Sequence, residues 1–91
     1  MNEEDRQMLI QDLIARMRRI EGQARGIQKM LESNRDCEEI ILQLSAMRAA
    51  ISKVAMAILA ADLRTCFHAK DASDASRRTI ERATRIFMKF S

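Results

Sequence analysis

The chain has 91 residues and a formal net charge of +3, and it contains no proline, two glycines, two cysteines and one histidine. That length fits one domain, residues 1–91, and the many helix-forming residues favour an all-α fold over a sheet. The chain shows no uninterrupted run of about 18 apolar residues and begins with an acidic segment. These features argue against a membrane span and a secretory signal, and for a cytoplasmic protein.

The first predicted helix spans about residues 3–32. Its apolar side chains recur at alternating spacings of three and four, which is typical of a helix with one packing seam. Gly22 and Gly26 lie on one side of this helix, where they either let another helix come close or are a tolerated weakness. Residues 33–35 are predicted to form a short turn. The seam comprises Ile10, Leu13, Met17, Ile20, Ala24, Ile27 and Leu31.

Basic residues gather in the second half of this helix. From Arg16 to Lys29 the chain carries five basic residues against one acid, Glu21. A basic stripe on a helix is typical of a nucleic-acid contact, although a solvated helix face has the same composition. The stripe therefore makes nucleic acid a candidate partner without deciding the matter.

The second predicted helix opens at Asp36, which with Glu39 approximates a capping box, and ends near residues 66–68. Apolar residues cover most of its circumference, which is typical of a helix that is buried on several sides. One other long helix cannot cover such a surface. We therefore expect an antiparallel dimer forming a four-helix bundle, with a three-helix monomer as the alternative.

A polar linker, residues 70–74, leads to a short third predicted helix at about residues 74–89. One face of this helix is apolar, with Ile80, Ala83, Ile86 and Phe87. The fold class expected from the sequence is thus all-α, with three helices in each protomer.

Cys37 and Cys66 lie near opposite ends of the second predicted helix, roughly 43 Å apart in one chain. In an antiparallel dimer, however, Cys37 of one chain approaches Cys66 of the other. The helix N-terminus favours a thiolate at Cys37, which is the predicted attacking thiol, and Cys66 is the predicted resolving thiol. The alternative is that both are small buried apolar residues. The chain has no Cys-x-x-Cys and no base spaced to activate a thiol, so we expect neither an enzyme nor a bound cofactor.

Four features between Arg16 and Cys66 carry a family resemblance: RRIEGQ-x-RGI, a cysteine four residues after Glu-Ser, QLSAMRAA, and a helix ending of the form L-x-x-C. With them the chain resembles the CsoR/RcnR family of bacterial transcriptional repressors. The resemblance implies a three-helix protomer, an antiparallel dimer and a homotetramer that is a dimer of dimers. It also implies binding to double-stranded operator DNA, relieved by an inducer at an inter-subunit cysteine site.

On this hypothesis the DNA contacts are electrostatic and lie on the first two helices. Two of the candidates, Arg16 and Lys53, also resemble family positions. A helical interaction protein, whose basic stripe serves solubility or an acidic partner, is the alternative from another functional class. The candidate DNA-binding residues are Arg16, Arg18, Arg19, Arg25, Arg48 and Lys53.

The inducer expected from the resemblance is sulfane sulfur. Copper sensors of the family carry a histidine, a tyrosine and a glutamate at the positions where this chain has Asp62, Asp36 and Arg82. Nickel and cobalt sensors use several histidines, whereas this chain has only His68. Formaldehyde sensors lack the second cysteine. The remaining CstR-like subgroup senses persulfide or polysulfide through di- or polysulfide bridges, here between the two cysteines. A Cu(I)-responsive repressor that uses the same two cysteines as metal ligands is the alternative.

Overall fold

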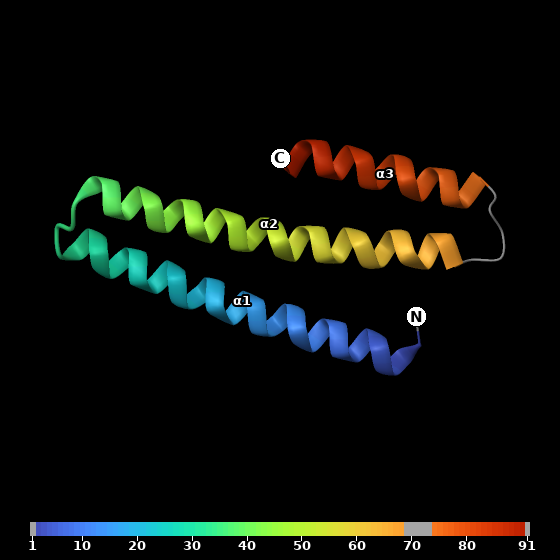
Figure 1. The fold of residues 1–91 in the computed structure, drawn as a ribbon, viewed down its shortest axis with the longest axis horizontal. Coiled ribbons are helices and arrows are strands. Elements are labelled where there is room, and N and C mark those ends of the chain that lie inside the picture. Colours follow the sequence, from blue (N-terminus) through green and yellow to red (C-terminus); the bar gives the residue numbers. More distant parts are fainter. Residues whose placement is uncertain (1, 69–73, 91) are drawn as a thin grey trace. The chain divides into compact units, whose positions relative to one another are not determined.

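The computed structural model describes the backbone of residues 2–68 and 74–90, and the side chains of residues 2–61 and 77–90. It contains three helices, α1 (Glu3–Glu32), α2 (Cys37–His68) and α3 (Asp74–Phe90), and the described residues include no strand (Figure 1). The three predicted helices and the all-α fold are confirmed. Most of the predicted linker lies outside the described residues. The chain divides into two compact units, Met1–Val54 and Ala55–Ser91.

Local hydrogen bonds fix both ends of α1. Asn2 caps its start, because the Asn2 side chain accepts a hydrogen bond of 2.7 Å from the Asp5 backbone N–H. At the other end the Ser33 N–H donates to the Lys29 carbonyl at 3.0 Å, and Asn34 takes a positive φ of 54°. Asparagine tolerates this left-handed conformation better than most residues do. The predicted turn at residues 33–35 is therefore confirmed.

The start of α2 differs from the predicted capping box. The Ile40 N–H donates to the Asp36 carbonyl at 3.2 Å, so Asp36 occupies the capping position. The Glu39 carboxylate, however, pairs with the Arg35 guanidinium at 3.4 Å. Among the described residues no side-chain hydrogen bond involves Asp36. The reciprocal bonds of a capping box are absent because the nearby cation offers Glu39 a charged partner.

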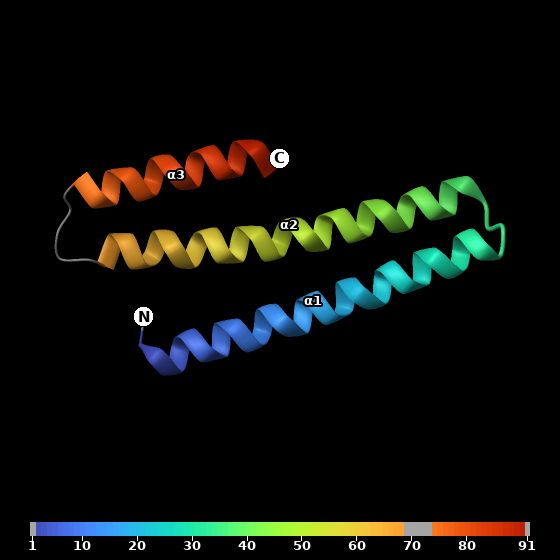
Figure 2. The same cartoon turned by 180° about the vertical axis from the view of Figure 1, so that it is seen from behind.

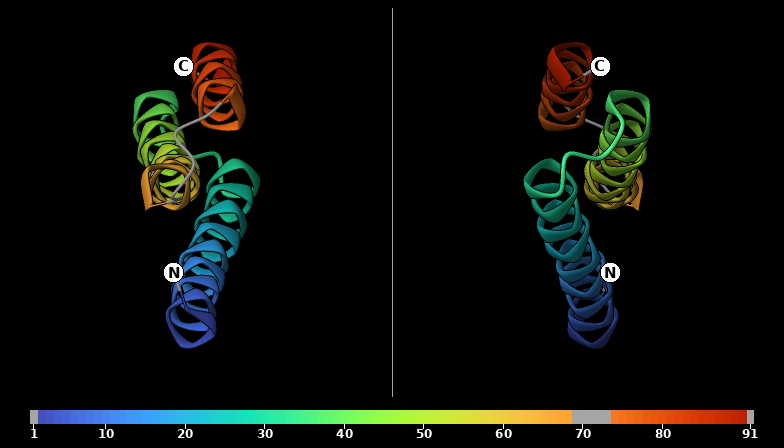
Figure 3. Two further views of the ribbon diagram at one scale, coloured as in Figure 1. Left: turned by 90° about the vertical axis from the view of Figure 1, so that its right-hand side faces the viewer. Right: turned by 90° about the vertical axis from the view of Figure 1, so that its left-hand side faces the viewer.

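The first unit pairs α1 with the beginning of α2, antiparallel to each other (Figures 2 and 3). Its buried side chains are Ile20, Ile27 and Val54. Ile20 and Ile27 belong to the predicted seam, so the phase of the seam is confirmed, while other members remain half exposed. A Cβ atom added at either glycine of α1 would meet nothing within 4 Å, so among the described residues neither glycine makes a close helix contact.

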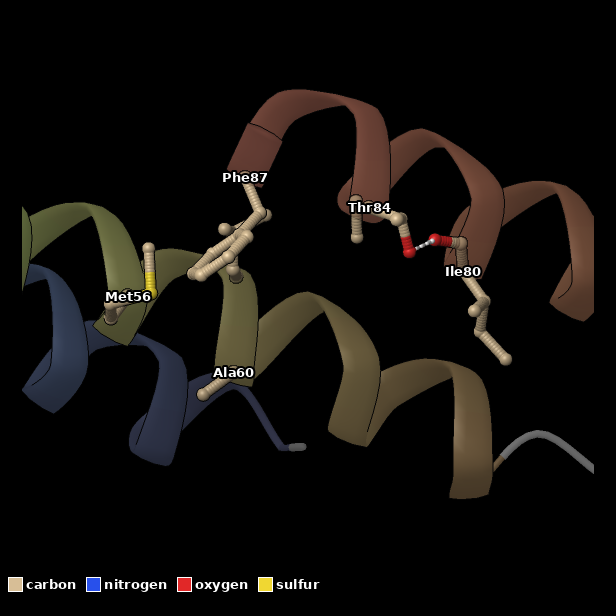
Figure 4. Close-up of a pocket in the computed structure, with 7 residues that line it drawn as sticks. Met56, Ala60, Ile80, Thr84 and Phe87 are labelled. Carbon is tan, nitrogen blue, oxygen red and sulfur yellow. Dashed lines mark hydrogen bonds between the residues drawn. The ribbon is translucent and has the colours of Figure 1, made fainter. Parts of the chain in front are cut away.

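The second unit pairs the rest of α2 with α3 (Figure 1). Ala83 is buried, and an apolar hollow of about 370 Å³ lies between the two helices (Figure 4). The predicted face of α3 is only partly right, because Thr84 lines the hollow in place of Ile86, which is 46% exposed. The Thr84 hydroxyl donates to the Ile80 carbonyl at 2.8 Å. Because this bond satisfies the hydroxyl, the Thr84 side chain can line an apolar hollow. The hollow is lined by Met56, Leu59, Ala60, Ile80, Ala83, Thr84 and Phe87.

Much of the apolar surface of α2 remains exposed. Among the described residues, the stretch Cys37–Ala61 is long and apolar enough to cross a membrane by length and composition. The stretch is not an uninterrupted apolar run, since charged residues such as Arg48 and Lys53 interrupt it. One helix of this kind is weak evidence for a span, because apolar helices of soluble assemblies have the same composition. The exposed large apolar residues on α2 are Ile41, Leu42, Leu44, Ile51 and Ile58.

Candidate functional site

Basic side chains from α1 and α2 meet around one hollow in the first unit. The hollow has a volume of about 310 Å³, and Arg16 and Arg19 of α1 line it together with Lys53 of α2. We call it the basic hollow. Its remaining lining residues are Gln23, Ala46, Ala49 and Ala50.

Helical spacing explains why these residues meet. Arg16, Arg19 and Gln23 are three and four residues apart, so they share one face of α1. The alanines of α2 lie at the matching spacing before Lys53 on the facing helix. Because alanine side chains end at Cβ, they leave the space that the longer basic side chains surround.

One of the three cations has an anionic neighbour. The Asp12 carboxylate accepts a hydrogen bond of 2.9 Å from Arg16 Nε, one helical turn away. This contact orients the guanidinium and leaves its two Nη groups for other acceptors. Within the described part of the chain, Arg19 and Lys53 form no ion pair. The hollow therefore presents a net positive charge.

The other three DNA-binding candidates lie elsewhere on the same helices. At about 100° per residue, Arg18 and Arg25 project from the side of α1 roughly opposite to Arg16, and Arg48 lies about 140° around α2 from Lys53. All three are exposed, and none lines the basic hollow. The structure thus brings together half of the predicted set.

Gln23 was not predicted as a functional residue. Its side-chain Oε1 is buried and has no hydrogen-bond partner, which holds for no other buried side-chain N or O atom of the described residues. A buried polar atom without a partner is uncommon and marks a position that a ligand or another group can satisfy. The sequence held a usable signal, because Gln23 lies one helical turn after Arg19.

The cysteines lie at the two ends of α2. Cys37 is the first residue of the helix, as predicted, and is an exposed thiol without a disulfide. Cys66 belongs to the last turn of α2, and its side chain lies outside the described residues. The described part of one chain contains no group of three or more His, Cys, Asp or Glu side chains that could hold a metal ion.

Comparison with known proteins gives the family. A family model described as a metal-sensitive transcriptional repressor matches residues 10–89. The copper-sensing transcriptional repressor CsoR of Bacillus subtilis is 38% identical over 76 residues, which are 84% of this chain and 75% of that protein. The copper-sensing transcriptional repressor RicR of Mycobacterium tuberculosis is 41% identical over 51 residues, 56% of this chain and 53% of that protein.

Solved structures agree with this match. The nickel-responsive transcriptional regulator InrS has a TM-score of 0.74 and 31% identity, over 89% of this chain and 91% of that one. The copper-sensing repressor CsoR with Cu(I) from Geobacillus thermodenitrificans has a TM-score of 0.74 and 29% identity, over 99% of this chain and 90% of that one. Members with known roles are repressors rather than enzymes, in line with the expectation from the sequence. The chain belongs to the CsoR/RcnR family of metal-sensitive transcriptional repressors.

Proposed function

We propose that residues 1–91 form one protomer of a cytoplasmic homotetramer, a dimer of dimers, that binds double-stranded operator DNA. An inducer that joins Cys37 of one chain to Cys66 of a neighbouring chain releases the DNA. The observation that carries the proposal is the basic hollow between two helices of a chain that belongs to a repressor family. A cluster of cations on two paired helices is suited to contacts with the phosphate backbone.

The proposed DNA-binding surface keeps all six basic candidates but ranks them. Arg16, Arg19 and Lys53 form its centre, since they converge on one hollow. Arg18, Arg25 and Arg48 face other directions, where neighbouring turns of the duplex or the arrangement of protomers would bring phosphates to them. These outer residues contribute less per side chain than the residues of the hollow.

The exposed apolar surface of α2 supports assembly. Ile41, Leu44 and Ile51 are exposed and lie three and seven residues apart, on one side of α2, and such an apolar patch is typical of a protein–protein interface. Antiparallel packing of two α2 helices would cover the patch and would place the start of one helix beside the end of the other. That arrangement creates the proposed inducer site from two chains.

Cu(I) is the inducer that the relatives favour. Two of the similar repressors are named copper-sensing, and one similar structure contains Cu(I). Soft thiolates are preferred ligands of Cu(I), so the proposed metal ligands are Cys37 and Cys66 of neighbouring chains. The relatives thus support the copper alternative over the sulfane-sulfur sensor expected from the sequence.

Sulfane sulfur stays a second candidate because of Asp62. This residue stands where the resemblance expects a histidine ligand in copper sensors, and a carboxylate is a poor ligand for Cu(I). In the sulfur mechanism the Cys37 thiolate takes the outer sulfur of a hydropersulfide, R–S–SH, which gives Cys37–S–SH and leaves the thiolate R–S⁻. The Cys66 thiolate of the facing chain then attacks Sγ of Cys37, the S–SH bond breaks, and a disulfide forms as HS⁻ leaves. If Cys66 is persulfidated first, the same attack gives a trisulfide and HS⁻.

Fluorescence anisotropy with labelled DNA from upstream of the encoding gene tests the proposal. The wild type should bind this DNA more tightly than a scrambled duplex. We expect release at one Cu(I) per cysteine pair in anaerobic buffer, and no release in Cys37→Ser. Complete release by hydropersulfide, with a covalent dimer joined by a disulfide or a trisulfide and only weak release by Cu(I), would instead establish the sulfur mechanism. Equal binding to the scrambled duplex would refute operator recognition.

A further inference from the structure

We propose that the basic hollow seats one backbone phosphate of the DNA, and that the Gln23 side-chain amide donates a hydrogen bond to this phosphate. The inference deepens the proposed function and rests on it. It turns a diffuse basic surface into one defined oxyanion site with contributions from two helices, and it adds a residue that carries no charge.

The size and shape of the hollow suit an oxyanion. Its volume of about 310 Å³ far exceeds the roughly 10–15 Å³ that a cavity needs to hold one water molecule. The hollow is therefore large enough for a tetrahedral phosphate group. The three alanines keep this space open, because a longer side chain at Ala46, Ala49 or Ala50 would occupy it.

The cations are arranged to hold an anion from two sides. Asp12 engages only Nε of Arg16, so the two Nη groups of that guanidinium can bind two oxygens of one phosphate. Arg19 adds a second guanidinium from the same face of α1, and Lys53 adds a compact ammonium from α2. An anion between these helices is therefore attracted from both helices at once.

Gln23 is the uncharged polar residue that lines the hollow. Its buried Oε1 has no partner, which is unfavourable unless something binds there. The oxygen and nitrogen of a glutamine amide are nearly indistinguishable in shape, and a half-turn about the last side-chain bond exchanges them. That half-turn places Nε2 at the buried position, where it can donate to a phosphate oxygen. With Nε2 at the buried position, Gln23 offers a hydrogen-bond donor, which suits a phosphate because its oxygens only accept hydrogen bonds.

Filling the hollow without changing any charge tests the proposal. Ala49 is exposed and lines the hollow, so a leucine at this position extends into the hollow without displacing the buried side chains of the core. The matched control is Gln28→Leu, at an exposed position on the far side of α1. We expect Ala49→Leu to weaken DNA binding on the order of tenfold or more and to lower the slope of log K against log salt by about 0.9 for each phosphate that the protein no longer neutralises. The control should match the wild type.

Gln23→Leu provides a second, independent variant. Loss of one hydrogen bond to a charged group should weaken binding on the order of tenfold while leaving the salt slope nearly unchanged, because no cation is removed. In the wild type, the side-chain NH₂ resonances of Gln23, identified by their absence in this variant, should shift when DNA is added. Circular dichroism and light scattering verify that helix content and assembly are retained.

The outcomes separate this inference from the proposed function. If the wild type binds no DNA, the proposed function itself fails. If the wild type binds but Ala49→Leu and Gln23→Leu bind equally well, and the Gln23 resonances do not move, the phosphate site is refuted while the repressor stands. Inorganic phosphate, compared with chloride at equal ionic strength, distinguishes the sources. Movement of the same resonances shows a site for free oxyanions as well, and movement with DNA alone shows a phosphodiester site.

Discussion

Replacing Ile41 with serine should dissociate the proposed oligomer without unfolding the protomer. Ile41 is 59% exposed in one chain and lies on the side of α2 roughly opposite Ala46 and Ala50, which face α1. Full burial of an isoleucine stabilises by about 1.5–3 kcal/mol, so the exposed share offers a partner about 1–2 kcal/mol. In a two-fold symmetric interface the loss counts twice, about 2–4 kcal/mol, which raises the dimer dissociation constant about 30- to 1,000-fold.

Light scattering and sedimentation over a range of protein concentrations measure this shift. Met8→Ser is the matched control, because Met8 is 66% exposed but lies on α1, away from the apolar surface of α2. We expect Ile41→Ser to dissociate at concentrations where the control remains assembled, while both keep their helix content. A monomeric wild type at micromolar concentration would refute the reasoning, and with it the inter-subunit cysteine site.

Three further predictions concern the core, the DNA contacts and the inducer. Ile27→Ala should lower the free energy of unfolding by about 2–4 kcal/mol in urea titrations, because Ile27 is buried. Leu31 is 59% exposed, so Leu31→Ala should lower the free energy of unfolding by less than about 1 kcal/mol, and equal losses would contradict the assigned core. Lys53→Gln should lower the slope of log K against log salt for operator binding by about 0.9 for each protomer that contacts DNA, and Arg48→Gln should lower it by less. A larger effect of Arg48→Gln than of Lys53→Gln would exclude the basic hollow as the centre of the interface. Asp62→His should make release by Cu(I) more complete while leaving the response to hydropersulfide unchanged, and an unaltered Cu(I) titration would show that this position does not set the metal response.

The helices were predictable because local chemistry determines them. A chain without proline and with only two glycines leaves few places where a helix must stop, and the stop at Ser33–Arg35 coincides with residues that favour turns. The phase of α1 also followed from sequence, since Ile20 and Ile27 occupy the predicted seam and are buried. These features depend on spacing along one helix.

Features that depend on two elements at once were less predictable. Glu39 pairs with Arg35 rather than with the backbone of Asp36, a competition between partners that a motif does not reveal. Thr84 rather than Ile86 faces α2, because the rotation of α3 follows from its packing. The sequence indicated six basic DNA-binding candidates on two helices, but only the pairing of α1 with α2 separates those of the hollow from the rest and buries the Gln23 side-chain oxygen.

The placement of the hollow gives the proposed inducer a physical route to the DNA. Cys37 begins α2, and Lys53 lies farther along the same helix, within the same unit as α1. We expect an inducer that bridges the ends of two α2 helices to shift α2 along α1, and so to move Lys53 relative to Arg16. A slide of about 1 Å stretches a hydrogen bond from about 2.9 Å to about 3.9 Å, beyond the range in which it holds a phosphate. Allosteric coupling of about 1–3 kcal/mol is of the size that breaking such a hydrogen bond supplies. Because Cu(I) and a sulfur bridge would both act through this displacement, the DNA interface and the inducer chemistry can be tested independently of each other.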